Sequence, residues 1–201
     1  MFLRRWAVGM KVAVAATVVV PLLFTATNVE AEDAHALALA DPQPSSEELE
    51  PGLEVYYTFG DVTDQNELAN AQSLIDRVES PEKKTLENLA FEDGPKTLNS
   101  GVGQFVIAQI NGFVRLAKGQ HTWTFWSNDG MRAIVGGAEI YKDDDRHPCD
   151  NKLGPVTVEA PSDGWYEVNI LYFNRKQSSC LFWDDEATEE SLPPEVFAHR
   201  K

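Results

Sequence analysis

Short apolar runs separated by Gly, Asn, Asp and Pro fill the second half of the chain, and this pattern predicts an all-β fold. The runs between residues 104 and 183 are QFVIAQI, GFVRLA, QHTWTFWS, MRAIVG, VTVEA, WYEVNILYF and CLFW. Closely spaced short strands of this kind are typical of a sandwich or a barrel. We therefore predict an antiparallel β-sandwich.

The stretch before these runs mixes one strand with helical signals. LEVYYTF at residues 53–59 is aromatic and β-branched, which predicts a strand. Asp64 is placed to cap a helix, with a glutamate three residues later. An apolar stripe at helical spacing follows, at Leu68, Ala71, Ile75 and Val78. Pro81 ends this helix and can begin a second one that reaches Leu89, so we predict a short helical insertion near residues 64–90.

The most aromatic run places its large side chains on two faces of a strand. Trp123 and Phe125 share one face, while Trp126 lies on the other. We assign Trp123, Phe125 and, from a later run, Tyr172 to the core. The next three residues, Asn128-Asp129-Gly130, accept the positive φ angles of a tight turn and therefore predict a hairpin.

The first 31 residues have the pattern of a removable secretory signal. The segment begins with three bases, at Arg4, Arg5 and Lys11. The apolar run Val12–Phe24 is shorter than the roughly 18 to 20 residues of a membrane span, and small residues at Val29 and Ala31 suit signal peptidase. An uncleaved membrane anchor is the alternative. We favour cleavage, which places the protein at the cell surface, in the periplasm or outside the cell.

The remainder divides into a linker and a single domain. Residues 32–52 are rich in Ala, Pro, Ser and Glu and show no sustained apolar period, so we predict a disordered linker. Residues 53–198 are enough for one domain with one core.

The charge of the chain excludes two classes of partner. It has 17 basic and 32 acidic residues and a formal charge of −15; without residues 1–31, 14 basic and 31 acidic residues remain, giving −17. A protein this acidic lacks a basic footprint for phosphates, and an anionic membrane surface repels it. We predict no nucleic-acid partner and, after signal cleavage, no membrane span.

Two cysteines, Cys149 and Cys180, lie 31 residues apart. An even number of cysteines in an exported chain indicates a disulfide, and closing this loop would stabilise the fold by roughly 3 to 4 kcal/mol. Two free buried thiols are the alternative. Scattered histidines and the lack of a CxxC motif argue against zinc.

Several motifs then occur in one order, and together they resemble a known family. They begin with Gly-Phe-Val-Arg-Leu at residue 112 and Trp-Thr-Phe-Trp-Ser-Asn-Asp-Gly at 123, and continue with Val-Gly-Gly at 135, Gly-Trp-Tyr at 164, Ile-Leu-Tyr-Phe-Asn at 170 and Leu-Phe-Trp at 181. This set resembles the protective-antigen fourteen-kilodalton (PA14) domain of toxins, flocculin-type yeast adhesins, glycosidases and bacterial surface proteins. The resemblance covers roughly residues 51–197 and implies a sandwich fold.

The resemblance also implies a binding site. In carbohydrate-binding members an Asp-Asp pair, joined by a cis peptide, and a neighbouring Asn hold a calcium ion that coordinates sugar hydroxyls. The matching residues here are Asn128, Asp129 and Asn174. Because Asn128 replaces an aspartate, the site has one formal negative charge where the family has two, which weakens the binding of the ion. The alternative is an ordinary turn, for which Asn, Asp and Gly are equally suited.

Two tryptophans and an acidic loop complete the candidates. Trp126 and Trp165 lie opposite the core faces of their strands and are candidate aromatic platforms for a sugar ring, although most sandwich tryptophans belong to the core. Acidic residues cluster in the loop that contains Cys149, at Asp143, Asp144, Asp145 and Asp150. Their spacing fits no EF-hand, so we interpret this loop as solvated.

No catalytic motif is present, and we predict that the protein is not an enzyme. The favoured function is a secreted or cell-surface module that binds a glycan or cell-surface polysaccharide, with calcium assisting. The alternative is a structural or protein-interaction domain of the cell envelope that binds neither metal nor sugar. A subunit with a surface-protein partner is a third interpretation.

Overall fold

The computed structural model describes residues 34–62, 67–92, 96–176 and 178–201. These residues belong to one unit. The predicted signal at residues 1–31 and the predicted cap Asp64 lie outside the described residues. None of the described helices is long and apolar enough to cross a membrane.

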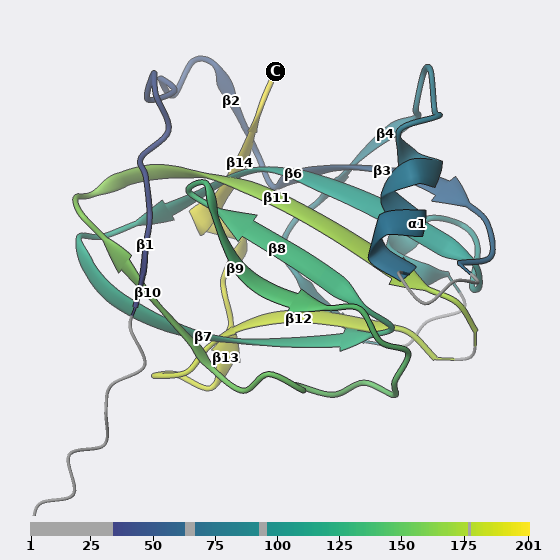
Figure 1. Cartoon of the computed structure of the whole chain (residues 1–201). Helices are drawn as coiled ribbons and strands as arrows, with labels where there is room; N and C mark the ends of the chain where they lie inside the picture. Colours follow the sequence, from purple (N-terminus) through teal and green to yellow (C-terminus); the bar gives the residue numbers. More distant parts are fainter. Residues whose placement is uncertain (1–33, 63–66, 93–95, 177) are drawn as a thin grey trace, which may run out of the picture. The chain divides into compact units, whose positions relative to one another are not determined.

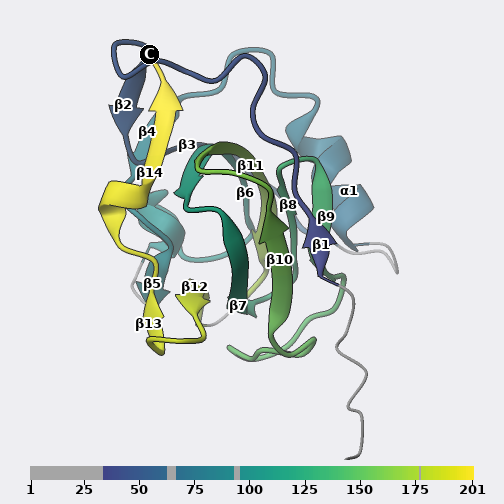
Figure 2. The ribbon, with the colours of Figure 1, turned by 90° about the vertical axis from the view of Figure 1, so that its left-hand side faces the viewer.

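Two β-sheets face each other across one core (Figures 1 and 2). The first sheet has the order β1 (His35–Ala36), β10 (Val156–Ala160), β7 (Gly119–Asn128), β12 (Cys180–Asp185) and β13 (Glu190–Ser191), with β5 (Ala90–Glu92) also on β12. The second has the order β2 (Leu49–Pro51), β14 (Phe197–Arg200), β6 (Val106–Leu116), β11 (Gly164–Asn174), β8 (Met131–Val135) and β9 (Ala138–Asp143). In this second sheet β3 (Leu53–Phe59) pairs with β6 and with β4 (Lys83–Leu86). The predicted antiparallel sandwich is confirmed, although β1 pairs with β10 in parallel.

Aromatic side chains fill the space between the sheets. Trp123, Phe125 and Tyr172 are fully buried, as predicted. Trp183 joins them, with ring centroids 4.9 Å from Trp123 and 5.1 Å from Phe125. Alternation along β7 and β12 therefore supplies the core from one face of each strand.

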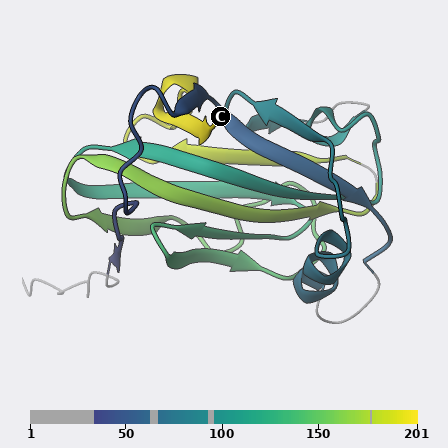
Figure 3. The ribbon, with the colours of Figure 1, turned by 90° about the horizontal axis from the view of Figure 1, so that it is seen from above.

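One helix, α1 (Glu67–Ile75), packs at one end of the second sheet (Figure 3). The predicted stripe is buried at Leu68, Ala71 and Ile75. It contacts Ile107 and Phe173 on the outer face of β6 and β11.

The prediction of a second helix through Leu89 is wrong. Residues 83–86 form the strand β4, whose Leu86 pairs with Leu53, and residues 90–92 form β5 on β12. The sequence there has only weak local propensity, so pairing with a sheet edge decides its structure.

The prediction of a disordered linker is wrong for residues 34–52. Leu37 and Ala40 are buried, and the amide N–H of Ala40 donates to the carbonyl of Trp165 at 3.0 Å. Two short strands, β1 and β2, complete the sheets in this segment. Its apolar residues are small or few after residue 40 and show no sustained period, although Leu37 joins the main core. At the other end, β14 extends past the predicted limit of residue 198 to Arg200.

The prediction of a hairpin at Asn128-Asp129-Gly130 is also wrong. These residues link β7 in the first sheet to β8 in the second, so the turn crosses between the sheets. Two short 3₁₀ helices, Thr97–Asn99 and Pro194–Val196, complete the described elements.

Candidate functional site

The Asn128-Asp129-Gly130 segment lies against the end of β11. The Asn128–Asp129 peptide is cis, as the family resemblance implied. The Asp129 N–H donates to the Phe173 carbonyl at 2.9 Å, and the Phe173 N–H donates to the Gly130 carbonyl at 3.1 Å. A Cβ at Gly130 would lie 2.5 Å from the Asp143 carbonyl oxygen, so only glycine fits this approach.

The structure brings Asn128, Asp129 and Asn174 together. The Asn174 Nδ2 donates to the Asn128 carbonyl at 3.4 Å and to the Ser178 carbonyl at 2.9 Å. The buried Tyr172 hydroxyl donates to the same Asn128 carbonyl, and burial raises the pKa of Tyr172 well above its ordinary value. The ends of β7 and β11 and the loop after β11 therefore form one cluster.

The Asp129 carboxylate joins three chain segments. Its Oδ2 accepts the backbone N–H of Arg175 at 2.7 Å, and the carboxylate also accepts the backbone N–H of His147. Burial raises the pKa of Asp129, although these hydrogen bonds and the nearby charges of His147 and Arg146 oppose the shift. Asp129 therefore fixes the loops at this end of the sandwich.

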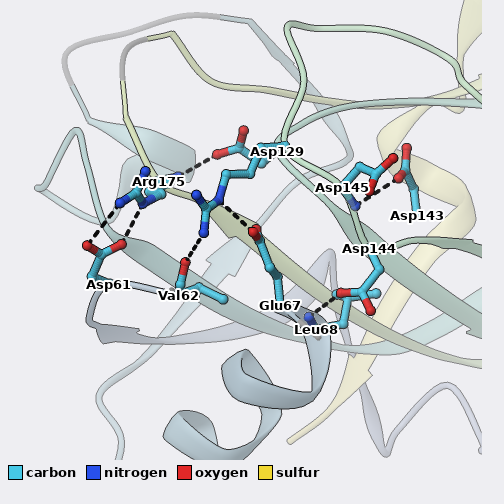
Figure 4. Close-up of polar contacts among 10 residues, drawn as sticks. Asp61, Val62, Glu67, Leu68, Asp129, Asp143, Asp144, Asp145 and Arg175 are labelled. Atoms are coloured by element: carbon cyan, nitrogen blue, oxygen red, sulfur yellow. Dashed lines mark hydrogen bonds and ion pairs between the residues drawn. The ribbon is translucent and has the colours of Figure 1, made fainter. Parts of the chain in front are cut away.

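Several basic residues lie near Asp129, and Figure 4 shows Arg175 beside it. The Arg175 Nε lies 2.6 Å from Asp61, and the Arg146 Nε lies 2.7 Å from Glu67. A pocket of about 320 Å³ opens here, lined by Asn128, Asp129, Arg146, His147, Pro148, Arg175, Lys176 and Ser178.

Sequence reasoning missed the basic residues of this pocket. Arg175 and Lys176 directly follow Asn174, so their adjacency was a usable signal. Arg146 carries no such signal, because the fold brings the loop after β9 to the turn.

The acidic loop has specific partners rather than a purely solvated role (Figure 4). The Asp144 Oδ1 accepts the Leu68 N–H at the start of α1 at 2.5 Å. The Asp143 carboxylate lies 2.9 Å from the His147 Nε2, and Asp145 pairs with Lys152 at 3.1 Å. Across the described residues, no group of three or more His, Cys, Asp or Glu side chains is placed to hold a metal ion.

The two candidate platforms lie elsewhere. Trp165 is the second residue of β11 and Asn174 is the last, which separates them by roughly 30 Å along the strand. Gln43 covers the Trp165 backbone through its Oε1, which accepts the Trp165 N–H at 2.9 Å. Trp165 therefore does not belong to the cluster around Asp129.

Trp126 faces outward from the first sheet beside its register partner Phe182, and 37% of its surface is exposed. It lines a second pocket of about 320 Å³ together with acidic residues that include Asp184 and Glu186. Asn128 follows two residues later on the same strand but lines the other pocket. The five predicted ligand residues thus divide among three places.

The predicted disulfide between Cys149 and Cys180 is confirmed. It ties the loop that carries Arg146 and His147 to the start of β12. Cys180 is the register partner of Asn128, so the bond lies directly behind the turn.

The residues at the turn fit a calcium ion poorly. Calcium takes six to eight oxygen ligands, several of them commonly carboxylates. Among the described residues that line the pocket, Asp129 is the one carboxylate, and two backbone N–H groups already donate to it. The Asn174 amide directs its nitrogen toward Asn128, and cationic side chains line the same pocket. Calcium at Asn128, Asp129 and Asn174 stays a prediction, and a titration described below tests it.

The sheet order and the inter-sheet turn define a PA14-like β-sandwich domain. Solved structures with this fold include the PA14 domain of the MpAFP antifreeze protein, with a TM-score of 0.61 and 16% identity over 81% of this chain and 96% of that one. The PA14 sugar-binding domain of an RTX adhesin has a TM-score of 0.60 and 16% identity over 74% of this chain and 98% of that one. The Epithelial Adhesin 9 A domain from Candida glabrata, in complex with Galb1-4GlcNAc, has a TM-score of 0.57 and 10% identity over 84% of this chain and 96% of that one.

At these identities the likeness concerns the fold. No model of a known protein family matches the chain, and no curated protein matches it.

Proposed function

We propose that the protein is a carbohydrate-binding module of the cell exterior, and that it holds its saccharide in the pocket beside Asp129. One observation carries this proposal: Asn128 and Asp129 line an open polar pocket, and the buried Asn174, from a distant part of the chain, donates a hydrogen bond to the Asn128 carbonyl. Convergent polar groups around a concave site are what small ligands require.

The comparisons and the disulfide support this function. Two of the similar folds are a sugar-binding domain and an adhesin domain bound to a disaccharide. The Cys149–Cys180 bond is typical of an oxidising compartment, which agrees with a secreted or cell-surface location. A glycan or cell-surface polysaccharide is the proposed partner, and a binding role without catalysis is part of the proposal.

A structural or interaction domain without sugar is the second candidate. The observation that favours it is the Asp129 carboxylate, which accepts N–H groups from two loops and so has a role in the fold by itself. The antifreeze protein domain has the same fold and supports this candidate equally. A surface-protein partner belongs to this interpretation.

A glycan array with two matched variants separates the candidates. Asp129→Asn removes the carboxylate at the pocket, and Asp163→Asn removes a carboxylate that accepts the Lys118 N–H at 2.7 Å, near the Gly164 end of β11. We expect Asp129→Asn to weaken glycan binding roughly tenfold or more, because a hydrogen bond to a charged group contributes about 1.5 to 3 kcal/mol. Asp163→Asn should bind as the wild type does.

Thermal unfolding of both variants checks that each is folded under the binding conditions. An array without any hit for the wild type would support the structural candidate. Equal binding by wild type and Asp129→Asn would place the saccharide elsewhere.

A further inference from the structure

The pocket beside Asp129 is basic, although the protein is acidic. Arg146, Arg175 and Lys176 line it together with His147, against the single lining carboxylate of Asp129. The whole chain carries a formal charge of −15. Basic side chains therefore converge on one concave point of the surface. Carboxylates outside the pocket pair with both arginines and with His147. An anionic group is therefore recognised by the N–H groups that these pairs leave free and by Lys176, rather than by a large net positive charge.

Acidic residues outside the pocket hold the two arginines in place. The Arg175 Nε and Nη2 donate to Asp61 at 2.6 and 3.3 Å, and Asp61 is not among the residues that line the pocket. A guanidinium has five N–H groups, so these contacts use two of them.

Arg146 is held in the same way. Its Nε lies 2.7 Å from the Glu67 Oε1, and its Nη2 donates to the Val62 carbonyl at 2.7 Å. Neither partner lines the pocket. Arginines fixed from behind lose little side-chain entropy when a ligand binds, which favours recognition of a planar anion.

Lys176 adds a cation at the rim. Its side chain is exposed, and its Nζ lies 5.6 Å from the centre of the Phe105 ring. The ring holds the ammonium group near the pocket without neutralising it.

We propose that this pocket binds the carboxylate or sulfate group of a terminal acidic sugar without a metal ion. The inference rests on the proposed carbohydrate-binding function and names its ligand class. Arg146, Arg175 and Lys176 donate hydrogen bonds to the anionic group, and Asp129 accepts one from a sugar hydroxyl. The cationic side chains that attract this ligand repel calcium.

Size and charge restrict the ligand to one terminal sugar. A pocket of about 320 Å³ lies at the lower end of the roughly 300 to 1,000 Å³ of small-ligand sites. A long polyanion would meet the acidic surface around the pocket, which opposes its binding.

Calorimetry with matched methyl glycosides tests the inference on the purified full chain. The pairs are glucuronide with glucoside, galacturonide with galactoside, and 6-sulfated with unsulfated galactoside; the last pair distinguishes sulfate from carboxylate. We expect the acidic member of at least one pair to bind roughly ten- to a hundredfold more tightly than its neutral partner. Excess calcium or EDTA should change neither the affinity nor the thermal midpoint.

Two lysine variants provide the control. Lys176→Gln should reduce the affinity for the acidic glycoside by roughly ten- to a hundredfold. Lys84→Gln should not, although Lys84 also lies over an aromatic ring, Tyr57, at 5.8 Å. Lys176 is exposed and Lys84 is half-buried, and neither is a buried core residue, so neither change endangers folding.

The outcomes separate this inference from the proposed function. Equal binding of acidic and neutral partners, or full affinity of Lys176→Gln, overturns the acidic-sugar inference and leaves carbohydrate binding in place. A heat of calcium binding that EDTA abolishes overturns the metal-free site. If neither these glycosides nor the array gives binding, both proposals are wrong.

Discussion

At the scale of single residues, the surroundings of two carboxylates shift their pKa values in opposite directions. Glu67 is buried, its Oε1 pairs with Arg146, and its Oε2 has no hydrogen-bond partner among the described residues. Burial raises the pKa of Glu67, and the hydrogen bond and charge of Arg146 oppose the shift. The exposed Glu48 differs, because hydrogen bonds from Ser45 lower its pKa.

These opposite shifts predict opposite pH effects on stability. The raised pKa of Glu67 means that the folded chain binds its proton more tightly than the unfolded chain does. The stability from this group is complete below its ordinary pKa of 4.5 and is lost as pH rises through the folded value. Glu67→Gln should therefore gain stability relative to the wild type as pH rises from about 4.5 toward neutral, as measured by urea unfolding at a series of pH values.

Glu48→Gln is the control for this experiment. Its lowered pKa gives stability above the ordinary value, and this stability is lost as pH falls through the folded value. The variant should lose stability relative to the wild type as pH rises. The same pH trend in both variants would contradict the assignment of burial as the cause at Glu67.

At the scale of elements, contacts distant in sequence decide what short segments become. Helix α1 is nine residues long, which is marginal for a helix alone. It is stabilised by its apolar face on β6 and β11 and by Asp144, which accepts the Leu68 N–H from a loop 76 residues away. The loop that carries Arg146 therefore also supplies the hydrogen bond that caps the start of α1.

Removing this contact tests its contribution. Asp144→Ala should lower the free energy of unfolding by about 1 kcal/mol, the usual effect of losing a helix cap, as measured by urea denaturation. Asp145→Ala is the matched change, because Asp145 pairs with Lys152 at the surface and should cost less than about 0.5 kcal/mol. Equal losses would show that Asp144 contributes no more than a surface charge.

The sequence could predict elements with a clear hydrophobic pattern, but not the short strands that form only because they pair with a sheet edge. Alternating runs such as residues 156–160 and 165–173 identified β10 and β11, and the stripe through Leu68 and Ile75 identified the helix face. Segments without a sustained apolar period, such as 34–52 and 83–86, could not be predicted, because pairing with sheet edges rather than their own composition orders them.

The same distinction applies to the site. Asn128, Asp129 and Asn174 came from motif order, and the structure brings them together. The alternation of side chains correctly placed Trp165 on the outer face of its strand. Alternation does not give the position along a strand, and Trp165 lies at the end of β11 opposite Asn174. Arg146 could not be found, because its place depends on the disulfide and on the path after β9.

At the scale of the whole molecule, the Cys149–Cys180 bond connects stability with the pocket. Replacing both cysteines by serine should lower the free energy of unfolding by roughly 3 to 4 kcal/mol, because the unfolded chain is no longer closed into a loop of 31 residues. It should also weaken saccharide binding, since His147 and Pro148 line the pocket beside Cys149. Urea unfolding and calorimetry measure the two effects.

Reductant supplies the control for the disulfide. It should destabilise the wild type to the level of the double serine variant and leave that variant unchanged. A wild type whose unfolding midpoint is insensitive to full reduction would contradict this role.

The pairing of β2 with β14 determines when the second sheet can be completed during folding. It joins residues 49–51 to residues 198–200, and the Lys201 N–H also donates to the Glu48 carbonyl at 3.0 Å. Synthesis from the amino end delivers these partners almost 150 residues apart. The second sheet therefore stays incomplete until the last strand has left the ribosome, so this part of the fold can form only after synthesis.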